Sequence, residues 1–385
     1  MSIRKETAML TLAAVFLGGF LIRSALPWLD EKNPPASPWP DQIIQPAIRG
    51  YADALAHIQR DAVFSAPVGD LQEVVAASLK AYLAQKDPYS DFLTPDEYER
   101  FMAASRGDHA GIGLDIEKRR NGDVICYPVP NSPAAHAGIK PGERLLALDG
   151  VAVHGRSLPT IVAMAAGGLG TSIVAELEGS NGNSRQVTII RAKFAAPAVS
   201  EYTLHSRHII KLAGFTPNTR QELDYLVSKQ RGHDPIILDL RGCGGGDFYA
   251  AVDSAMLFLK KGDRIVSVRG RSGSQTYSAT LSHEPPARRI VLWQDEFTAS
   301  AAEIFIAALT ENDRGTSVGT TTAGKGTRQD IIKLQDGAAL ILTTGYLLTP
   351  QEIRFDGSGL KPMRRIEGKM PDDDAFLSKT ATLIG

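Results

Sequence analysis

Three polar side chains late in the chain have types and spacing suited to nucleophilic catalysis. Ser300 begins an apolar-periodic segment, Lys325 stands between two glycines, and Gln329 follows four residues later. A serine hydroxyl attacks a carbonyl only when a neighbouring base removes its proton. Residues 297–329 contain no histidine, so Lys325 is the candidate base. The pattern indicates a serine–lysine pair, a known variant of the histidine-based triad.

The same residues have two simpler interpretations. Ser300 and Glu303 form the S-A-A-E pattern of a capping box, which marks the start of a helix. Gly319–Lys325 imitates a phosphate-binding loop, but the next residue is Gly326 in place of the hydroxyl that would hold magnesium, and a strand pattern follows. Nucleotide binding is therefore disfavoured, whereas helix capping remains an alternative role for Ser300.

A lysine needs a lowered pKa to act as a base. Free lysine has a pKa near 10.4, so only about one molecule in 2,500 is neutral at pH 7. Burial can lower that pKa by about 3 units, which costs about 4 kcal/mol against the charged form. The flanking glycines allow backbone to pack closely around Lys325, and Gln329 can orient the amine without adding charge. We therefore expect a buried Lys325.

Composition limits the range of functions. The chain has 385 residues, 43% of them hydrophobic, and a net charge of −1, which suits two or three domains with proper cores. It has no basic run, so we expect no nucleic-acid partner. Cys126 and Cys243 lie far apart and form no metal or redox spacing, and we expect no metal or other cofactor.

Residues 1–29 are predicted to be a signal anchor or a signal peptide. Arg4 and Lys5 precede an uncharged run, Thr7–Ile22, whose sixteen residues suit a signal-peptide core better than a full span of about 20. Arg23–Ala25 is a poor cleavage site, so we favour an uncleaved anchor over a cleaved signal. Either way the positive charge stays cytoplasmic, and the bulk is expected at the periplasmic or extracytoplasmic face of the membrane.

The remaining chain divides by its local patterns. Residues 30–41 carry four prolines and read as an extended tether, and 42–105 show helical spacing of apolar positions. From residue 194 to about 370, apolar strand runs alternate with amphipathic helices, which is typical of an α/β fold. Residues 371–385 are expected to be a polar, peripheral tail.

Residues 106–193 resemble a PDZ domain. The resemblance depends on G-I-G-L at 111–114 and on the sequence NSPAAHAGIKPGERLLALDG after it. A glycine-containing turn lets successive backbone N–H groups bind a terminal carboxylate, and the next strand pairs with an extended peptide. The expected peptide-binding residues are Gly111, Ile112, Gly113 and Leu114. We expect Leu114, Ile116 and a helix near Ile161 to line an apolar pocket behind that loop.

Together these motifs resemble the carboxyl-terminal processing peptidases, also called tail-specific proteases. The segments that match are FTASAAEI, GKGTRQ 25 residues after Ser300, and DLRGCGGG at 239–246. That family's pattern places a nucleophilic serine, a general-base lysine and a supporting glutamine where Ser300, Lys325 and Gln329 stand. D-P-Y-S-D-F-L-T-P-D-E-Y at 87–98 matches the string that precedes the inserted PDZ domain, and supports the resemblance without carrying chemistry. The resemblance implies an α/β, crotonase-like core.

The resemblance also implies an oxyanion hole, the pair of N–H donors that stabilises a tetrahedral intermediate. Ala301 and Gly245 fill its two positions. This chain departs from the family in having Gly-Cys-Gly at 242–244, where polar residues and proline are common. We expect that departure to loosen the loop. Met363, where the family commonly has aspartate, is a second departure and has no functional interpretation.

The resemblance implies an exported serine endopeptidase that binds free, apolar C-terminal tails and cuts upstream of them. A non-catalytic PDZ scaffold is the main alternative. A Ser-His-Asp hydrolase would need a histidine near the catalytic strands, where only His205, His208 and His233 lie, and the chain has no G-x-S-x-G motif. The helical segment 42–105 is either a dimerisation arm of a homodimer or a cap on the catalytic domain.

Overall fold

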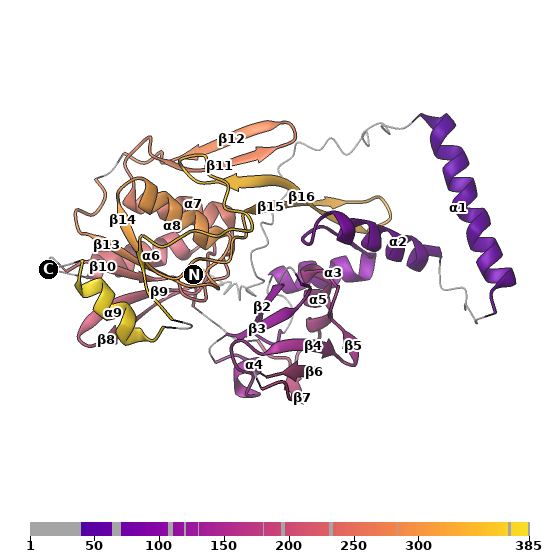
Figure 1. Ribbon diagram of the computed structural model, residues 1–385, viewed down its shortest axis with the longest axis horizontal. Helices are drawn as coiled ribbons and strands as arrows, with labels where there is room; N and C mark the ends of the chain where they lie inside the picture. The colour runs from indigo at the N-terminus through magenta and orange to yellow at the C-terminus, as the bar shows by residue number, and fades with distance from the viewer. Residues whose placement is uncertain are drawn as a thin grey trace, which may run out of the picture.

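The computed structural model describes ten stretches of the chain. They are residues 40–63, 71–106, 111–118, 121–129, 131–179, 181–193, 197–230, 234–282, 284–368 and 371–383. The predicted N-terminal anchor and nearly all of the proline-rich tether lie outside them. Within these stretches no helix combines the length and apolar character that a membrane span requires. They form one mixed sheet, two antiparallel sheets and several N-terminal helices (Figure 1).

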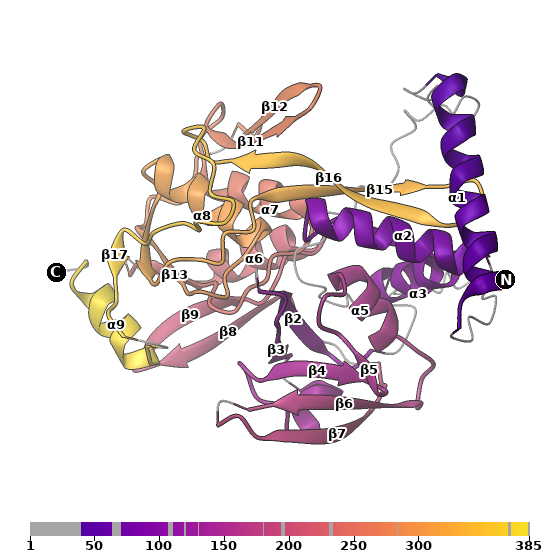
Figure 2. The same cartoon turned by 45° about the vertical axis from the view of Figure 1, so that its right-hand side comes forward.

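The N-terminal helical segment joins the catalytic domain through a strand. Its elements are α1 (Asp41–Asp61), α2 (Leu71–Lys86), β1 (Asp91–Leu93) and α3 (Pro95–Arg106). α1 lies at the outer end of the segment, with Tyr51 Oη 2.7 Å from Ser78 Oγ of α2, and α2 lies beside the long β15–β16 hairpin (Figures 1 and 2). β1 pairs antiparallel with β16, with Asp91 opposite Ile341. The segment thereby becomes part of a catalytic-domain sheet.

The second domain is an antiparallel sheet closed by one helix. Its elements are β2 (Leu114–Lys118), β3 (Val124–Pro128), α4 (Pro133–His136), β4 (Arg144–Leu148), β5 (Val151–Ala152), α5 (Leu158–Ala165), β6 (Ser172–Glu178) and β7 (Ser184–Ile190). Alternate residues of β6 are buried, because successive side chains of a strand point to opposite faces. Ile161 of α5 is 1% exposed and packs with Ile173 and Leu177 of β6. The helix expected near Ile161 is confirmed.

The catalytic domain contains the remaining strands in two sheets. A six-stranded sheet has the order β17-β14-β13-β10-β9-β8, and a five-stranded sheet contains β1, β11, β12, β15 and β16. The bounds of its strands are β8 (Val199–Leu204), β9 (Arg207–Leu212), β10 (Ile236–Asp239), β11 (Arg264–Gly270), β12 (Gly273–Ser278), β13 (Ile290–Gln294), β14 (Gly315–Gly319), β15 (Thr327–Lys333), β16 (Ala339–Leu348) and β17 (Arg364–Arg365). Its helices are α6 (Thr219–Lys229), α7 (Phe248–Ala255), the 3-10 turn η1 (Met256–Phe258), α8 (Ala301–Glu311) and α9 (Asp373–Ala381).

Both faces of the six-stranded sheet are covered, which explains why its strands read as continuous apolar runs. Ile236 and Leu238 of β10 belong to the large core that includes α7 and α8. Ile237, between them, faces the opposite core together with Trp293 and Phe376. The predicted α/β core, with a PDZ-like domain inserted and helices before it, is confirmed.

The end of the chain differs from the polar tail expected after residue 370. Residues 373–381 form α9, and Phe376 on this helix is 1% exposed. Its ring packs against Trp293 with centroids 5.3 Å apart, and the Trp293 indole donates to Thr380 at 2.9 Å. Charged residues surround Phe376 in the sequence and hide this apolar contact. α9 is therefore part of the core.

Three parallel strands bring the sequence motifs to one edge of the six-stranded sheet. β14, β13 and β10 are neighbours and run parallel. Their carboxyl ends lead into residues 320–325, 295–300 and 240–246 respectively. In open α/β sheets the functional crevice lies outside these carboxyl ends. The topology thus explains why segments far apart in sequence meet.

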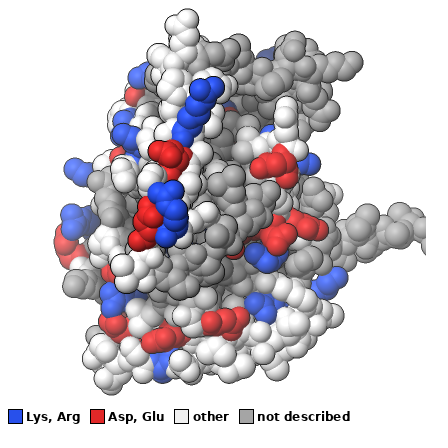
Figure 3. All heavy atoms as spheres, turned by 90° about the vertical axis from the view of Figure 1, so that its right-hand side faces the viewer, with Lys and Arg blue, Asp and Glu red and all other residues white. Residues whose placement is uncertain are grey.

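Surface charge is mixed where the structure describes it. On the face drawn in Figure 3, basic and acidic side chains lie interspersed. This pattern agrees with the net charge of −1.

Candidate active site

Ser300 is held in an unusual backbone conformation between β13 and α8. Its φ is 57° and its ψ is −117°, a region that residues with a side chain rarely occupy. Such strain persists only where surrounding contacts enforce it, and it is concentrated at functional sites. The Ser300 side chain is 0% exposed, and its Oγ has no hydrogen-bond partner in the described part of the chain. The hydroxyl therefore does not cap α8.

The carboxylate of Glu303 joins the backbone at Ser300 to the backbone at Lys325. Oε2 accepts from the backbone N–H of Ser300 at 2.8 Å and from that of Lys325 at 2.9 Å. Oε1 accepts from the Thr322 hydroxyl at 2.5 Å and from the Gly324 N–H at 2.8 Å. Because one oxygen binds both backbones, Ser300 and Lys325 lie side by side.

Four donors give Glu303 a larger role than helix capping. The carboxylate is fully buried, and burial raises its pKa to about 7, while the four hydrogen bonds act in the opposite direction. An ionised carboxylate only accepts hydrogen bonds, and these four donors satisfy both of its oxygens. We infer that Glu303 is ionised in the folded protein. The S-A-A-E pattern predicted a structural role for Glu303, but it predicted only the local contact of Glu303 with Ser300.

Lys325 has the surroundings that a neutral lysine requires. Its side chain is buried, and burial lowers its pKa to about 7, with nearby Glu303 acting in the opposite direction. Its ammonium nitrogen lies 5.5 Å from the centre of the Tyr89 ring. The lowered pKa agrees with the shift that a general-base role requires.

The glycines around Lys325 are needed because another backbone packs on them. A Cβ added to Gly324 would lie 2.6 Å from the Gly359 nitrogen, and one added to Gly326 would lie 2.7 Å from the Asp356 nitrogen. Residues 355–360 thus form the wall of the lysine loop. Sequence analysis missed this segment, although its F-D-G-S-G-L pattern signals a tight turn. Met363 beyond it is 51% exposed, and nothing in the structure explains its replacement of aspartate.

Gln329 lies on β15, on the same side as Thr327. Its amide nitrogen Nε2 donates to Thr327 Oγ1 at 2.9 Å and to Thr343 Oγ1 at 3.1 Å. Its Oε1 is buried and has no hydrogen-bond partner among the residues described. Ser300 and Lys325 are thus juxtaposed by Glu303, and Gln329 is fixed four residues beyond the lysine with its acceptor oxygen unused.

Gly245, which the sequence predicted as an oxyanion-hole residue, lies against Ser300. A Cβ added to Gly245 would approach within 3.0 Å of both the Ala301 nitrogen and Ser300 Cβ, and its φ is 109°. The close contacts and the positive φ each require glycine at position 245. The Gly245 N–H contacts the thiol of Cys243, whose pKa burial raises to about 12. That donor therefore lies beside Ser300 and points at the buried sulfur of Cys243.

The loop at 242–246 is held more firmly than the sequence suggested. Asp295 accepts from the Gly242 N–H at 2.9 and 3.1 Å, one contact for each carboxylate oxygen. The carbonyl of Cys243 accepts from the Ala299 N–H at 2.9 Å, and that of Gly245 accepts from the Phe215 N–H at 2.8 Å. The expected loosening is wrong, because contacts outside the loop fix it.

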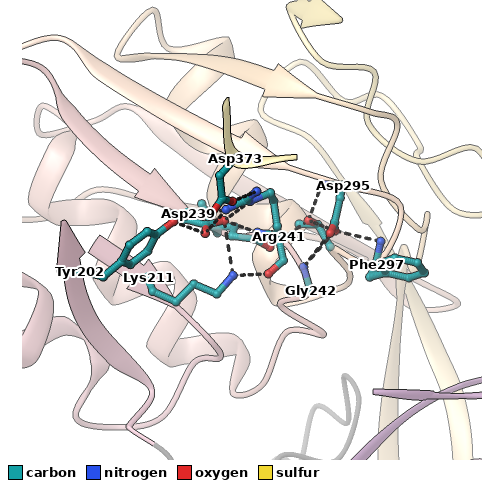
Figure 4. Close-up of polar contacts among 10 residues, drawn as sticks. Tyr202, Lys211, Asp239, Arg241, Gly242, Asp295, Phe297 and Asp373 are labelled. Carbon is teal, nitrogen blue, oxygen red and sulfur yellow. Dashed lines mark hydrogen bonds and ion pairs between the residues drawn. The ribbon is translucent and has the colours of Figure 1, made fainter. Parts of the chain in front are cut away.

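A second cluster, shown in Figure 4, fixes the start of this loop. Buried Asp239 binds the Arg241 guanidinium at 2.8 Å, and the Lys211 ammonium donates to the Arg241 carbonyl. Arg241 also donates to Asp373 of α9 at 2.8 Å and stacks on the Trp293 ring at 4.8 Å. The D-L-R motif is therefore a support that connects the oxyanion loop with α9.

The predicted carboxylate loop of the PDZ domain has its carbonyls turned inward. The Ile112 carbonyl accepts from the Ala134 N–H at 2.8 Å, and the Gly113 carbonyl accepts from Val129 N–H at 2.9 Å and Ser132 Oγ at 2.8 Å. In a trans peptide the following N–H points opposite to the carbonyl. The N–H groups of Gly113 and Leu114 therefore point away from these partners.

The histidines named for a Ser-His-Asp alternative do not approach Ser300. His205 and His208 lie at the turn before and the start of β9, which is the amino edge of that strand. The motifs lie at the opposite, carboxyl edge. His233 lies outside the residues that the structure describes. The arrangement thus disfavours a histidine base from the β8–β9 hairpin.

These features define a PDZ-containing α/β protein with a serine and a buried lysine at the carboxyl edge of a parallel sheet. The sequence pattern of peptidase family S41 matches residues 208–365, and that of the PDZ domain matches residues 124–178. The chain belongs to peptidase family S41.

Individual relatives agree with that assignment. The chain is 30% identical to the carboxy-terminal processing protease CtpA of Bacillus subtilis over 307 residues, 79% of this chain and 66% of the relative. It is 29% identical to the carboxyl-terminal-processing protease of Synechocystis over 318 residues, 80% of this chain and 74% of the relative. The chain spans 57% of the length of a probable CtpA-like serine protease from Staphylococcus haemolyticus.

A solved structure shows the same fold. The photosystem II D1 C-terminal processing protease superposes with a TM-score of 0.70 at 24% identity, covering 87% of this chain and 90% of that one. At this identity the likeness concerns the fold.

Proposed function

We propose that this protein is a serine endopeptidase in which Ser300 is the nucleophile, Lys325 the general base and Gln329 its supporting residue. One observation carries the proposal. A single oxygen of Glu303 binds the backbone N–H groups of both Ser300 and Lys325, at 2.8 and 2.9 Å, beside a lysine whose burial lowers its pKa to about 7. A capping serine or a structural lysine would need neither the strained backbone nor the neutral amine.

The chemistry follows from these positions. Ser300 Oγ attacks the peptide carbonyl carbon while its proton passes to Lys325 Nζ. The carbonyl oxygen becomes an oxyanion, for which the Ala301 N–H is the proposed donor, joined by the Gly245 N–H once substrate turns it away from the Cys243 sulfur. Lys325 then gives the proton to the leaving amine, and the acyl group stays on Ser300. A water molecule, deprotonated by Lys325, releases the acyl group and restores the serine.

The Glu303 carboxylate acts against the proposed general-base role of Lys325. Its charge favours the ammonium form of Lys325, which opposes a base. Four hydrogen bonds already satisfy that carboxylate, so it has little need of a fifth donor. Burial then outweighs the attraction, and Lys325 titrates close to neutral pH.

We also propose that the PDZ domain binds the free C-terminus of the substrate. The outward N–H groups of Gly113 and Leu114 suit a carboxylate, and β2 after them suits an added peptide strand. Charge-assisted hydrogen bonds contribute about 1.5–3 kcal/mol each. A peptide that ends in a carboxamide should therefore bind at least about tenfold more weakly than the free acid.

Substrate access requires a movement. Ser300 has no exposed surface, and Tyr127 of the PDZ strand β3 packs on Phe297, three residues before Ser300, with ring centroids 4.4 Å apart. An incoming chain must separate these surfaces before it reaches the hydroxyl.

The test uses proteins with apolar C-termini as substrates. Wild type should cut them, and Ser300→Ala and Lys325→Arg should not, because a guanidinium keeps its proton. Ser254→Ala is the matched control, since Ser254 is also fully buried with an unbonded hydroxyl, but on α7. Retained cleavage by a folded Ser300→Ala protein would reject the assignment.

Export and membrane attachment are proposals that depend on residues 1–29, which lie outside the described residues. Fractionation should place the full chain in the membrane pellet, with later residues open to added protease. A soluble species that begins near Ala25 would favour a cleaved signal. The homodimer stays a prediction.

A further inference from the structure

The loop between α2 and β1 reaches the catalytic domain through the carboxylate of Asp87. Oδ2 of Asp87 accepts from Ser90 Oγ and from Thr343 Oγ1, both at 2.5 Å. Oδ1 accepts from the Tyr89 N–H at 3.3 Å. The backbone N–H of Thr343 donates in turn to Ser90 Oγ at 3.0 Å. Thr343 lies on β16, 256 residues from Asp87 in sequence, so these hydrogen bonds form a junction between two distant parts of the chain.

The direction of each proton in this junction is determined. A threonine hydroxyl has one proton, and Thr343 uses it to donate a hydrogen bond to Asp87. The Thr343 oxygen can therefore only accept further hydrogen bonds. That oxygen accepts from Gln329 Nε2, and Thr327 Oγ1 accepts from the same nitrogen. The amide of Gln329 must therefore turn its nitrogen to the threonines and its buried Oε1 away from them.

The same loop also contacts the lysine directly. Tyr89 places its ring 5.5 Å from Lys325 Nζ. Thr327 and Gln329 share a face of β15, as their hydrogen bond shows, and Lys325 lies two residues before Thr327. The Lys325 side chain thus contacts a ring from the N-terminal segment and lies four residues before an amide that the same segment orients.

We propose that Asp87, Tyr89 and Thr343 are positioning residues for Lys325, which hold the Gln329 oxygen and the Tyr89 ring face toward its amine. The inference rests on the proposed function and deepens it. It changes the interpretation of residues 87–98, which sequence analysis treated as a family marker without chemistry. It also explains why the N-terminal segment pairs β1 with β16 directly beside Thr343.

The proposal predicts a direction for the lysine's titration. An acceptor oxygen and an aromatic face both favour the ammonium form. The groups that the structure places near the Lys325 amine are Glu303 from α8 and Tyr89 from the α2–β1 loop. The proposal adds the uncharged Gln329 amide, which Asp87 anchors through Thr343. Without its hydrogen bond to Thr343, the Gln329 amide would turn its NH2 group toward Lys325 Nζ, and the pKa of Lys325 would fall. General loosening would instead admit water and raise that pKa toward its ordinary value.

The experiment removes one hydroxyl. Thr343→Val keeps the shape of the side chain but cannot donate to Asp87 or accept from Gln329. The pKa of Lys325 is measured by NMR of ¹³Cε-lysine in the inactive Ser300→Ala protein, with Lys325→Met to assign the signal. We expect Thr343→Val to lower the proton affinity of Lys325 by roughly tenfold, and to lower kcat of the otherwise wild-type enzyme by about 10- to 100-fold through misplacement. Thr343→Ser should restore both.

Lys80→Met is the control for loosening of the same segment. Lys80 holds α2 to α3 through Glu97 at 2.6 Å and makes no described contact with Gln329. It should lower stability and leave the titration of Lys325 unchanged. An unchanged or raised pKa in Thr343→Val, or an equal shift in Lys80→Met, would overturn the proposal. If wild type cut no peptide, the proposed function would fail, yet the NMR titration would still decide this inference.

Discussion

Replacing Lys325 by methionine should stabilise the protein while removing its activity. Burial gives the folded protein a Lys325 pKa of about 7, against a model value of 10.5 for the unfolded chain. Between those values the unfolded state binds more protons, so the stability of wild type rises with pH by about 1.4 kcal/mol per unit across that window. Methionine has a similar length and no charge to bury, so the variant lacks this dependence.

The gain in free energy of unfolding of Lys325→Met over wild type should be largest at and below pH 7. A pKa lowered from 10.5 to about 7 sets an upper limit of about 5 kcal/mol, and we expect about 2–4 kcal/mol because Glu303 loses a nearby positive charge. The advantage should shrink as pH rises toward 10.5. Urea unfolding from pH 6 to pH 10, followed by fluorescence of the buried Trp293, measures it.

Lys333→Met is the matched control, since Lys333 is an exposed lysine at the end of β15, the strand that follows Lys325. It should change stability by less than about 0.5 kcal/mol at every pH. A Lys325→Met protein that is no more stable than wild type at pH 7, or whose difference from wild type does not vary with pH, would refute the account of a buried, easily neutralised lysine.

Three further substitutions test the supports of the site. Glu303→Ala leaves four buried donors without an acceptor and should destabilise by more than about 3 kcal/mol, a loss that thermal melting measures; melting near the wild-type temperature would contradict this. Asp295→Ala frees the Gly242 N–H and should lower kcat by about 10²–10³-fold with little change in KM, whereas an unchanged kcat would separate Asp295 from the oxyanion loop. Phe376→Ala should cost about 3–5 kcal/mol, since α9 belongs to the core, and a loss under 1 kcal/mol would restore a peripheral tail.

The fold was predictable from local patterns because both sheets follow simple periodicities. The strand runs before each motif, the helix after Ser300 and the helix near Ile161 all have clear apolar spacing. Where polar residues dominate, the pattern failed. α9 was missed because its one large buried ring is surrounded by charged residues.

The site was predictable only in part. Ser300, Lys325 and Gln329 were found because they match a family motif, but the residues that hold them are distant in sequence. Glu303 binds the Lys325 N–H across 22 positions, and Asp87 reaches Thr343 across 256. Such contacts depend on the order of strands in a sheet, which no local pattern encodes. The same reason explains the error over the glycine loop, whose stability comes from Asp295 and Phe215.

The central claim is that Lys325 activates Ser300, and one labelling measurement tests it without a known substrate. A fluorophosphonate reacts with an activated serine hydroxyl, and intact-protein mass spectrometry follows the reaction from pH 5 to pH 9. We predict a single adduct, located at Ser300 by peptide mapping, whose rate of formation rises through a midpoint near pH 7, where Lys325 loses its proton. The rate in Lys325→Met should be lower by at least about 100-fold at every pH. An adduct on another residue, or equal labelling of Ser300 in Lys325→Met, would contradict the account.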